Sequence, residues 1–372
     1  MPAVQERAGV LRERLLARIS AAGPISVADY MRAALYDPEC GYYIAQAPIG
    51  APQKTGGDFV TAPEISQMFG ELLGLWSVQS WADVGAPQEI VLGELGPGRG
   101  VLMQDALWAC RVAPQFRSAA RVHLVEVNPI LKAAQMERLK DVPHVAWNAS
   151  LQELPAGPCV ILANEFLDCM PIRQFVRAPD GWRERLVGAA EGQLAFGLGA
   201  VVKPTQLAAS AAGRAALEKA PEGAVYEFAP ELAGFIDALA ARLHAAPGRA
   251  LFVDYGGDGL EFGDTLQALR RHKKCDALAE PGAADLTAHV DFRALSDLAR
   301  AAGLDVAGPA TQSAFLRALG VEARAQTLQS ANPHRKDEID KALHRLTAPN
   351  QMGDLFKVIC LSSPGLPPAA GF

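Results

Sequence analysis

The chain has 372 residues, of which 50% are hydrophobic and 20% are charged, and its formal net charge is −6. This length and composition predict a globular protein with a sizeable core in one large domain or two. Because there is no basic block, a surface that binds nucleic-acid phosphates is disfavoured, and nucleic acid is not expected as a partner. The six cysteines show no CxxC spacing, which predicts reduced thiols and neither a metal site nor a redox pair.

The N-terminal residues, MPAVQERAGVLRERLLARIS, have the pattern of an amphipathic helix in which acids and arginines are mixed. They lack the apolar segment of a secretory signal peptide, and a mitochondrial transit peptide would contain fewer acids. No apolar run reaches the ~18 residues that a membrane-spanning helix needs. The sequence therefore predicts a cytoplasmic location without membrane insertion.

Helical periodicity predicts two helices near the N-terminus, Val10–Ser20 and Ser26–Leu35, and the residue type at position 26 suits an N-cap. A loop rich in glycine and proline, Asp37–Pro63, separates them from a third predicted helix, Ser66–Trp81. These elements precede the part of the chain that carries the motifs.

The polar, glycine-rich segment Lys54–Glu64 can be interpreted as a lid that closes over a ligand. The alternative is a surface connection in which Thr61 or Ser66 caps the following helix. The sequence by itself favours the surface connection.

The most informative segment is Glu89–Gly100, EIVLGELGPGRG. It predicts a buried strand, Ile90–Glu94, which enters a glycine-rich turn and then a helix over Val101–Cys110. Such a turn lets the backbone bend tightly and approach a ligand closely. A second predicted strand, Val122–Glu126, ends in a carboxylate that is placed to accept hydrogen bonds from both ribose hydroxyls. The glycines at alternate positions are Gly96, Gly98 and Gly100.

The pattern distinguishes between cofactors. The dinucleotide fingerprint needs a small third residue where this chain has Val101 or Met103, and no P-loop motif is present. E-x-G-x-G-x-G followed by an acidic second-strand end is instead the pattern of class I S-adenosylmethionine methyltransferases. Glu94, the three glycines and Glu126 are therefore predicted to bind that cofactor. A tight turn without a ligand is the alternative, and the two strand-end acids argue against it.

Strands and helices alternate through the rest of the chain, which predicts a doubly wound, largely parallel α/β sheet of the Rossmann-like type. Ligands bind such sheets at the carboxyl ends of the strands, where the glycine turn, Glu126 and Asn164 all lie. The further predicted elements are a helix from Asn128 to Leu139, strands at Val145–Trp147, Cys159–Ala163 and Ala250–Tyr255, a helix at Asp291–Ala302, and strands at Leu304–Ala307 and Phe356–Leu361.

Two stretches of the chain are additional to a minimal sheet of this kind: residues 1–88 and a long segment between two of the predicted strands. The segment Arg177–Arg249, roughly 70 residues long, separates the predicted strands Cys159–Ala163 and Ala250–Tyr255, whereas a usual connection has ~2–6 residues. Turn signals at Pro179-Asp180-Gly181 and Glu191-Gly192 predict β-hairpins there, followed by a crossover helix, Glu231–Ala246. The predicted domains are an N-terminal helical cap and lid, a methyltransferase core in two segments, and a β-rich insertion that includes the crossover helix, at residues 1–88, 89–177 with 250–363, and 178–249.

Carboxylates follow the predicted strand Cys159–Ala163, at the position that faces the transferred methyl group in this fold. Glu165 and Asp168 are candidate catalytic residues, because carboxylates there can hold a guanidinium in bidentate fashion and aim one nitrogen at the methyl group. The alternative for Asp168 is a cap of the following turn. Asn164 is assigned to the cofactor. His289 is a candidate for taking the acceptor's proton, although a lone histidine is more often structural.

Six segments occur in an order that resembles the MidA-type methyltransferase family: GPISVADYMRAALYDPECGYY, GGDFVTAPEISQMFGELLG, ELGPGRG, NEFLDCMPIRQF, FVDYGG and DLTAHVDF. The resemblance extends from the region of Gly23 to that of Leu361. This family includes a mitochondrial complex I assembly factor that methylates an arginine of a complex I core subunit. The resemblance implies a protein-arginine N-methyltransferase that uses S-adenosylmethionine, with Glu94–Gly100 at the cofactor and a protein substrate of the complex I type.

Three functions stay open on the residues alone. The first is methylation of a protein arginine, the second is methylation of a small molecule or another side chain, and the third is a non-catalytic, cofactor-binding assembly chaperone. The intact glycine turn and carboxylates argue against the third function, but they do not separate the first two.

Overall fold

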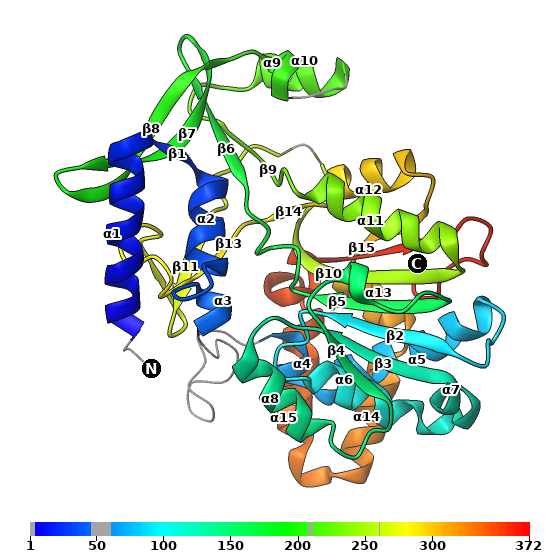
Figure 1. Ribbon diagram of the computed structural model, residues 1–372. Coiled ribbons are helices and arrows are strands. Elements are labelled where there is room, and N and C mark those ends of the chain that lie inside the picture. The colour runs from blue at the N-terminus through cyan, green and yellow to red at the C-terminus, as the bar shows by residue number, and fades with distance from the viewer. Residues whose placement is uncertain (1–3, 46–60, 208–210, 260) are drawn as a thin grey trace.

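Eight of the sixteen described strands form one mixed sheet, which lies on the right in Figure 1. The computed structural model describes residues 4–45, 61–207, 211–259 and 261–372. The strand order is β15-β16-β10-β5-β2-β3-β4; the strands from β10 to β4 are parallel, whereas β16 pairs antiparallel with both β10 and β15. The strands are β2 (Ile90–Leu95), β3 (Ala120–Val125), β4 (Val145–Asn148), β5 (Cys159–Asn164), β10 (Gly248–Gly257), β15 (Asp305–Thr311) and β16 (Phe356–Ser362), and β14 (Val290–Asp291) pairs with the end of β10.

Helices cover both faces of this sheet, because its central strands bury alternate residues in two different core layers. In β5, Val160 and Leu162 pack into one layer, while Ile161 and Ala163 pack into the other. The first layer is completed by α5 (Gln67–Asp83), α6 (Val101–Ala109), α7 (Pro114–Ala119), α13 (Gln312–Ala318), α14 (Val321–Ala331) and α15 (Lys336–Thr347). The second is completed by α11 (Leu232–Ala245) and α12 (Phe292–Ala301), and α8 (Pro129–Arg138) follows β3.

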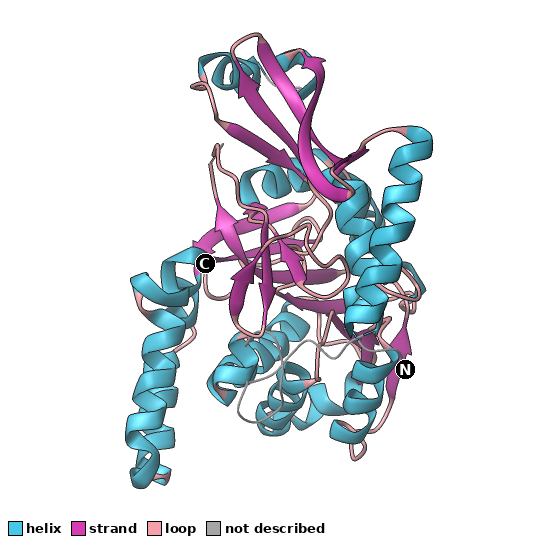
Figure 2. Cartoon of the chain, turned by 90° about the vertical axis from the view of Figure 1, so that its left-hand side faces the viewer, coloured by secondary structure: helices cyan, strands magenta, loops and turns pink. Residues whose placement is uncertain are grey.

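A second packed region stands beside the central sheet. It contains α1 (Val4–Ala22), α2 (Val27–Tyr36) and α3 (Tyr42–Ala45), at the left of Figure 1, and two smaller sheets. One sheet, at the top of Figures 1 and 2, has the order β1-β7-β6-β9 with β8 on the other edge of β7. The other has the order β12-β11-β13. The strands are β1 (Ile25–Ser26), β6 (Arg173–Ala178), β7 (Gly181–Ala190), β8 (Gln193–Val202), β9 (Val225–Phe228), β11 (Gln267–Arg270), β12 (Lys273–Cys275) and β13 (Asp285–Thr287), with the helices α9 (Pro204–Leu207) and α10 (Ala211–Lys219) between β8 and β9.

The parts of this second region are held together by one hydrophobic core, to which distant stretches of the chain contribute. Its buried members include Leu11, Tyr30, Val187, Ala268 and Leu286. The N-terminal helices, the β6–β9 sheet and the β11–β13 sheet are therefore packed as one structural layer.

The sequence prediction of a doubly wound α/β fold with an N-terminal helical part and a β-rich insertion is confirmed. The two predicted hairpin turns occur: β6 and β7 are antiparallel across Asp180, and β7 and β8 are antiparallel across Glu191 and Gly192. Both residues of the second turn have left-handed φ values, +52° and +75°. The predicted cap at Ser26 also occurs, because its hydroxyl accepts a hydrogen bond from the Asp29 N–H at 3.0 Å.

The predicted division at residues 1–88, 89–177 with 250–363, and 178–249 stays a prediction, and packing crosses its boundaries. Phe69 and Trp76 of α5 belong to the predicted cap, yet they pack in the core of the central sheet with Leu102. The strands β11 to β13 belong to the predicted methyltransferase core, yet they pack with the N-terminal helices.

Across the described ranges, no helix combines the length and the apolar character that crossing a membrane requires.

Candidate functional site

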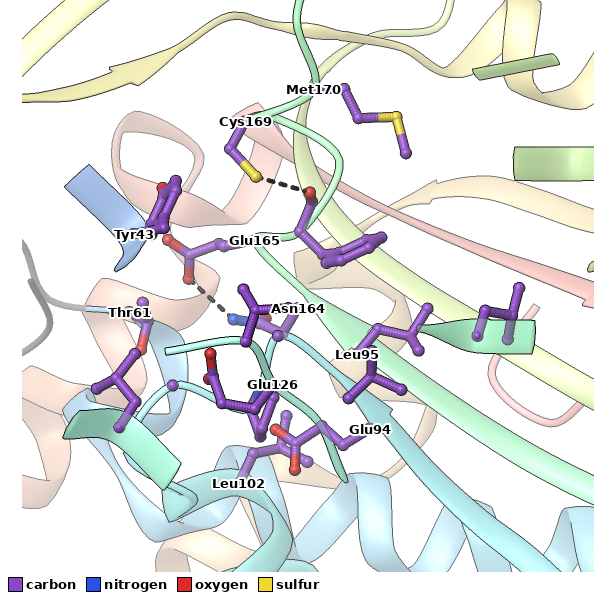
Figure 3. Close-up of a pocket in the computed structure, with 18 of the residues that line it drawn as sticks. Tyr43, Thr61, Glu94, Leu95, Leu102, Glu126, Asn164, Glu165, Cys169 and Met170 are labelled. Carbon is purple, nitrogen blue, oxygen red and sulfur yellow. Dashed lines mark hydrogen bonds between the residues drawn. The ribbon is translucent and has the colours of Figure 1, made fainter. Parts of the chain in front are cut away.

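A cavity of about 420 Å³ lies where β2, β3 and β5 end, and residues of the N-terminal region complete its wall (Figure 3). This is the edge at which doubly wound sheets bind their ligands. Its described lining residues include five glutamates and a single guanidinium, that of Arg99. Such an excess of carboxylates favours a ligand with positive charge. The glutamates are Glu64, Glu94, Glu126, Glu165 and Glu231.

Two glycines of the turn, Gly96 and Gly98, line the cavity, whereas Gly100 lies beside Gln135 and is not among the lining residues. Gly96, Gly98 and Gly100 have φ values of +62°, +54° and +75°, which residues with a Cβ rarely adopt. The Gly96 N–H donates to the carbonyl of Val125 at 3.1 Å, so the turn is tied to the end of β3. A Cβ on Gly96 would lie 3.2 Å from the ring of Phe166. Glycine is thus required both by the backbone conformation and by the space in the turn.

Glu94 lies near the end of β2 and points into the cavity, where Figure 3 shows its carboxylate beside that of Glu126. It is 3% exposed, and its Oε2 has no hydrogen-bond partner among the described residues. Burial, together with repulsion from Glu126, raises the pKa of Glu94 to about 8. A buried carboxyl with a free oxygen is a ready partner for a cationic group of a ligand.

Glu126 follows β3 and is fixed by two hydrogen bonds. Its Oε1 accepts from the N–H of Asn128 at 2.7 Å, and its Oε2 accepts from the side-chain amide of Gln135 at 3.0 Å. The same Gln135 amide donates to the carbonyl of Gly98 at 2.6 Å, while its oxygen accepts from the indole of Trp147 at 2.8 Å. Gln135 therefore connects the glycine turn with the carboxylate that was predicted to hold the ribose.

Asn164 and Glu165 stand at the end of β5. Glu165 has a left-handed φ of +51°, and its N–H donates to the carbonyl of Val253 at 2.8 Å. Its Oε1 accepts from the Asn164 amide at 3.0 Å and from the Ala62 N–H at 3.2 Å. Burial, with repulsion from Asp168, raises the pKa of Glu165 to about 8. A non-glycine residue in this conformation is strained, and such strain is found most often at functional sites.

The structure does not bring Asp168 to the cavity beside Glu165. Its side chain is buried behind the lining, and burial raises the pKa of this carboxyl to about 6. The carboxyl of Asp168 accepts hydrogen bonds from Tyr255 and from the backbone N–H of Cys169, so the alternative prediction, a local capping role, fits it better. Asp254 at the end of β10 fixes the rest of this loop, since its Oδ2 accepts from the N–H groups of Phe166, Leu167 and Asp168 at 3.0, 2.8 and 3.2 Å.

His289 also lies outside the cavity, contrary to the proposed contact with the acceptor. Its side chain is exposed and packs edge to face on the ring of Tyr255, with centroids 5.6 Å apart. Tyr255 is itself buried near the end of β10. The sequence order placed His289 near the strand ends but could not show on which side of Tyr255 it lies.

The N-terminal region supplies the wall opposite the sheet, with Tyr36, Tyr43 and Thr61 among the lining residues. Most of the predicted lid, residues 54–60, lies outside the described residues. At its end, the Thr61 side chain makes no capping bond to the short helix α4 (Ala62–Ile65), whereas Ser66 caps α5 by accepting from the Met68 N–H. Of the two predicted caps, the one at Ser66 is therefore observed, whereas Thr61 and Glu64 line the cavity.

The cavity fits S-adenosylmethionine on the chemistry of its atoms. The free Oε2 of Glu94 suits a cationic amino-acid end, and Glu126 suits a diol. Asn164 adds a buried side-chain oxygen without a hydrogen-bond partner among the described residues. In the described part of the chain, no three side chains of the metal-binding types are grouped to hold a metal ion.

Four residues of this arrangement were not singled out from the sequence: Gln135, Asp254, Tyr36 and Tyr43. An acid at the end of a strand was a usable signal for Asp254. The tyrosines stand in the segment GPISVADYMRAALYDPECGYY, where nothing marks them as cavity residues. Gln135 carries no local signal, because its role arises from the meeting of α8 with the glycine turn.

Comparison with known proteins supports this geometry. Residues 72–310 match the model of a family of S-adenosyl-L-methionine-dependent methyltransferases. The chain is 39% identical to a zebrafish (Danio rerio) protein named protein arginine methyltransferase NDUFAF7, mitochondrial, over 93% of this chain and 85% of the relative. It is 34% identical to the human protein of that name, over 93% of this chain and 82% of the relative.

A crystal structure from Burkholderia thailandensis, bound to S-adenosyl-homocysteine, superimposes with a TM-score of 0.85 at 29% identity, covering 100% of this chain and 96% of that one. The predicted cytoplasmic location is contradicted, because the curated relatives are named as mitochondrial proteins. The N-terminal segment, in which glutamates are mixed with arginines and on which that prediction rested, is therefore no guide to the location.

Proposed function

Since the chain belongs to the family of S-adenosylmethionine-dependent methyltransferases and uses that cofactor, we propose that it N-methylates an arginine of a partner protein. The observation that carries this proposal is the carboxylate of Glu165 at the end of β5. It is fixed by the N–H of Ala62 and the amide of Asn164, and it faces a cavity with an excess of acid. An anchored carboxylate in an acidic cavity suits a guanidinium.

When bound, the cofactor supplies an electrophilic methyl group on a sulfonium. We assign its contacts to the residues at the strand ends. Glu94 would pair with the ammonium of its amino-acid end, and Glu126 would accept from the ribose hydroxyls. The glycine turn would allow close approach of the backbone, and Asn164 would present its free side-chain oxygen. The three glycines are Gly96, Gly98 and Gly100.

Glu165 has two parts in the proposed reaction. Its carboxylate orients the acceptor guanidinium so that one nitrogen lies in line with the bond between methyl carbon and sulfur. As the carbon–nitrogen bond forms and the carbon–sulfur bond breaks, that nitrogen must lose a proton. Burial raises the pKa of Glu165 to about 8, and a bound guanidinium would favour its charged form, so the carboxylate would be poised to accept that proton near neutral pH. Asp168 and His289 are not needed in this scheme.

The acceptor protein is proposed to be a subunit of respiratory complex I or a similar assembly. The similarity to curated relatives named as protein arginine methyltransferases supports a protein as the acceptor. The resemblance to the MidA-type family supports the complex I subunit.

The test is to incubate the protein and its Glu165→Gln variant with cofactor carrying a labelled methyl group and a lysate of the source organism. We expect label on an arginine of one protein, a loss of about 100-fold or more in the variant, and unchanged affinity for S-adenosylhomocysteine. The exposed Glu137→Gln is the matched control. Label on a small molecule or on another side chain would contradict the proposal. So would the absence of transfer by a protein that binds the cofactor, which would favour an assembly chaperone.

A further inference from the structure

Two tyrosines of the N-terminal region form an aromatic wall of the cavity. Tyr36 ends α2 and Tyr43 lies in α3, and both line the cavity. Their rings stack, with centroids 5.9 Å apart and planes inclined by 28°. Tyr42, which is fully buried, meets Tyr43 edge to face at 5.2 Å and supports it from behind. The wall is therefore built on packed side chains.

The hydroxyl groups of both tyrosines are directed to partners on other elements. The Tyr36 hydroxyl donates to the carbonyl of Cys169 at 3.1 Å. The Tyr43 hydroxyl donates to Oδ1 of Asp285 on β13 at 2.6 Å. Because each hydroxyl already has an acceptor, it fixes the orientation of its ring and leaves the ring as the surface that a ligand can contact.

Glu165 lies against this wall from the side of the sheet. Figure 3 shows its carboxylate extending toward Tyr43. One of its oxygens, Oε1, is fixed by the Asn164 amide and by the Ala62 N–H. An aromatic surface beside a carboxylate attracts cations by two different means, the ring quadrupole and the charge.

We propose that Tyr36 and Tyr43, together with Glu165, form a specificity subsite that selects a planar guanidinium over an ammonium ion. This inference rests on the proposed function. A guanidinium can lie on an aromatic ring and donate parallel hydrogen bonds to a carboxylate at its edge. A lysine ammonium is compact and strongly hydrated, and it cannot satisfy both contacts in one position. The wall therefore separates arginine from lysine, which carry the same charge.

The experiment measures binding rather than turnover, on full-length protein saturated with S-adenosylhomocysteine. The probes are N-acetyl-arginine methylamide and N-acetyl-lysine methylamide, whose dissociation constants are determined by NMR titration. The variants are Tyr43→Leu, which removes the ring, and Tyr43→Phe, which keeps it. Phe196→Leu on β8 is the matched control, because this exposed aromatic residue lies outside the cavity. Tyr36→Leu provides a second test should Tyr43→Leu lose affinity for S-adenosylhomocysteine.

We expect the wild type, Tyr43→Phe and Phe196→Leu to bind the arginine probe more tightly than the lysine probe. Tyr43→Leu should weaken binding of the arginine probe by about 3-fold to 30-fold, which corresponds to one desolvated cation–π contact. The same substitution should reduce the preference for the arginine probe over the lysine probe. Unchanged arginine affinity in Tyr43→Leu would overturn the subsite and leave the proposed function standing. A wild-type protein that binds S-adenosylhomocysteine but not the arginine probe would overturn both.

Discussion

Gln135 shows how much one buried side chain can organise at this site. It is fully buried on α8, and it makes three hydrogen bonds to groups from three other parts of the chain. Its amide joins the carbonyl of Gly98 to the carboxylate of Glu126, and Trp147 holds its oxygen in place. Because buried polar groups are costly when they lack partners, all these hydrogen bonds favour one arrangement of the turn and the carboxylate.

The first prediction follows from this arrangement and concerns Gln135→Leu, which keeps the approximate volume but removes the hydrogen bonds. Glu126 then loses a donor that orients it toward the ribose hydroxyls. We expect S-adenosylhomocysteine affinity to fall about ten-fold, the equivalent of one charge-assisted hydrogen bond. Calorimetry on the variant and on Gln193→Leu, an exposed substitution at the start of β8, checks this. Unchanged affinity in a folded Gln135→Leu protein would show that Glu126 needs no such support.

For single residues, the sequence could predict the location of those that directly follow or end a recognisable strand. Glu94 and Glu126 were found because each ends an apolar run, and the glycines because they stand between such a run and a helix. His289 was misplaced because its position depends on the ring of Tyr255, 34 residues earlier in the chain. Gln135 was not found because its partners come from other elements. Local signals thus identified groups at strand ends but not the contacts that orient them.

At the scale of elements, the loop after β5 owes its shape to β10. Asp254 accepts hydrogen bonds from three consecutive N–H groups of this loop, and its second oxygen accepts from the N–H of Tyr255 at 2.9 Å. The loop begins with Glu165 in a left-handed conformation, which costs conformational energy unless neighbouring contacts hold it. Asp254 is therefore a positioning residue for Glu165, since it acts on the backbone that carries it.

The second prediction concerns Asp254→Asn. The amide can present only one acceptor oxygen, so the N–H groups of the loop and that of Tyr255 can no longer all be satisfied. We expect the free energy of unfolding to fall by about 1.5–3 kcal/mol and methyl transfer to fall more than S-adenosylhomocysteine affinity. Urea unfolding and calorimetry on the same preparation measure this. Asp297→Asn, at an exposed position of α12, is the control. Equal losses of binding and transfer would mean that Asp254 supports the whole site rather than the loop.

Secondary-structure elements, like single residues, were predicted where the signal is local and were missed where it depends on other parts of the chain. Strands of the central sheet were recognised because both of their faces are buried, which leaves continuous apolar runs. The hairpin strands β11 and β12 were missed because they carry Arg270, Lys273 and Lys274 and have little buried surface. The two-residue strand β1 has no pattern of its own, and it exists only through its pairing with β7.

At the scale of the whole molecule, the cavity is assembled from separate packed layers. The central sheet contributes the cofactor side, and the N-terminal region contributes the tyrosine wall. Arg32 of α2 forms an ion pair with Glu231 at the start of α11, which connects the two regions next to the cavity. Since exposed ion pairs contribute little energy, we attribute the joint mainly to shared hydrophobic contacts.

This assembly also buries several carboxyl groups at the cavity. Glu94 and Glu165 both have a pKa of about 8, in each case chiefly through burial. In the unfolded chain these groups titrate near 4.5. Between these values the folded protein holds protons that the unfolded chain has released, so the free energy of unfolding decreases as pH rises. This contribution to stability is complete below about pH 4.5 and is lost as pH rises through about 8.

The third prediction uses Glu94→Gln, whose neutral amide resembles the protonated carboxyl. Each such group gives a slope of up to roughly 1.4 kcal/mol per pH unit, so the protein without cofactor should melt at a lower temperature near pH 8.5 than near pH 6. The variant should melt close to the wild type at about pH 5.5 and above it at about pH 8.5. Melting temperatures across this range check the prediction, with the exposed Glu137→Gln expected to follow the wild type throughout. If Glu94→Gln were less stable than the wild type by a margin that grows with pH, the Glu94 carboxylate would be ionised and stabilising in the fold. That result would place its pKa below that of an ordinary glutamate and would contradict the conclusion that burial and the neighbouring Glu126 disfavour its charged form.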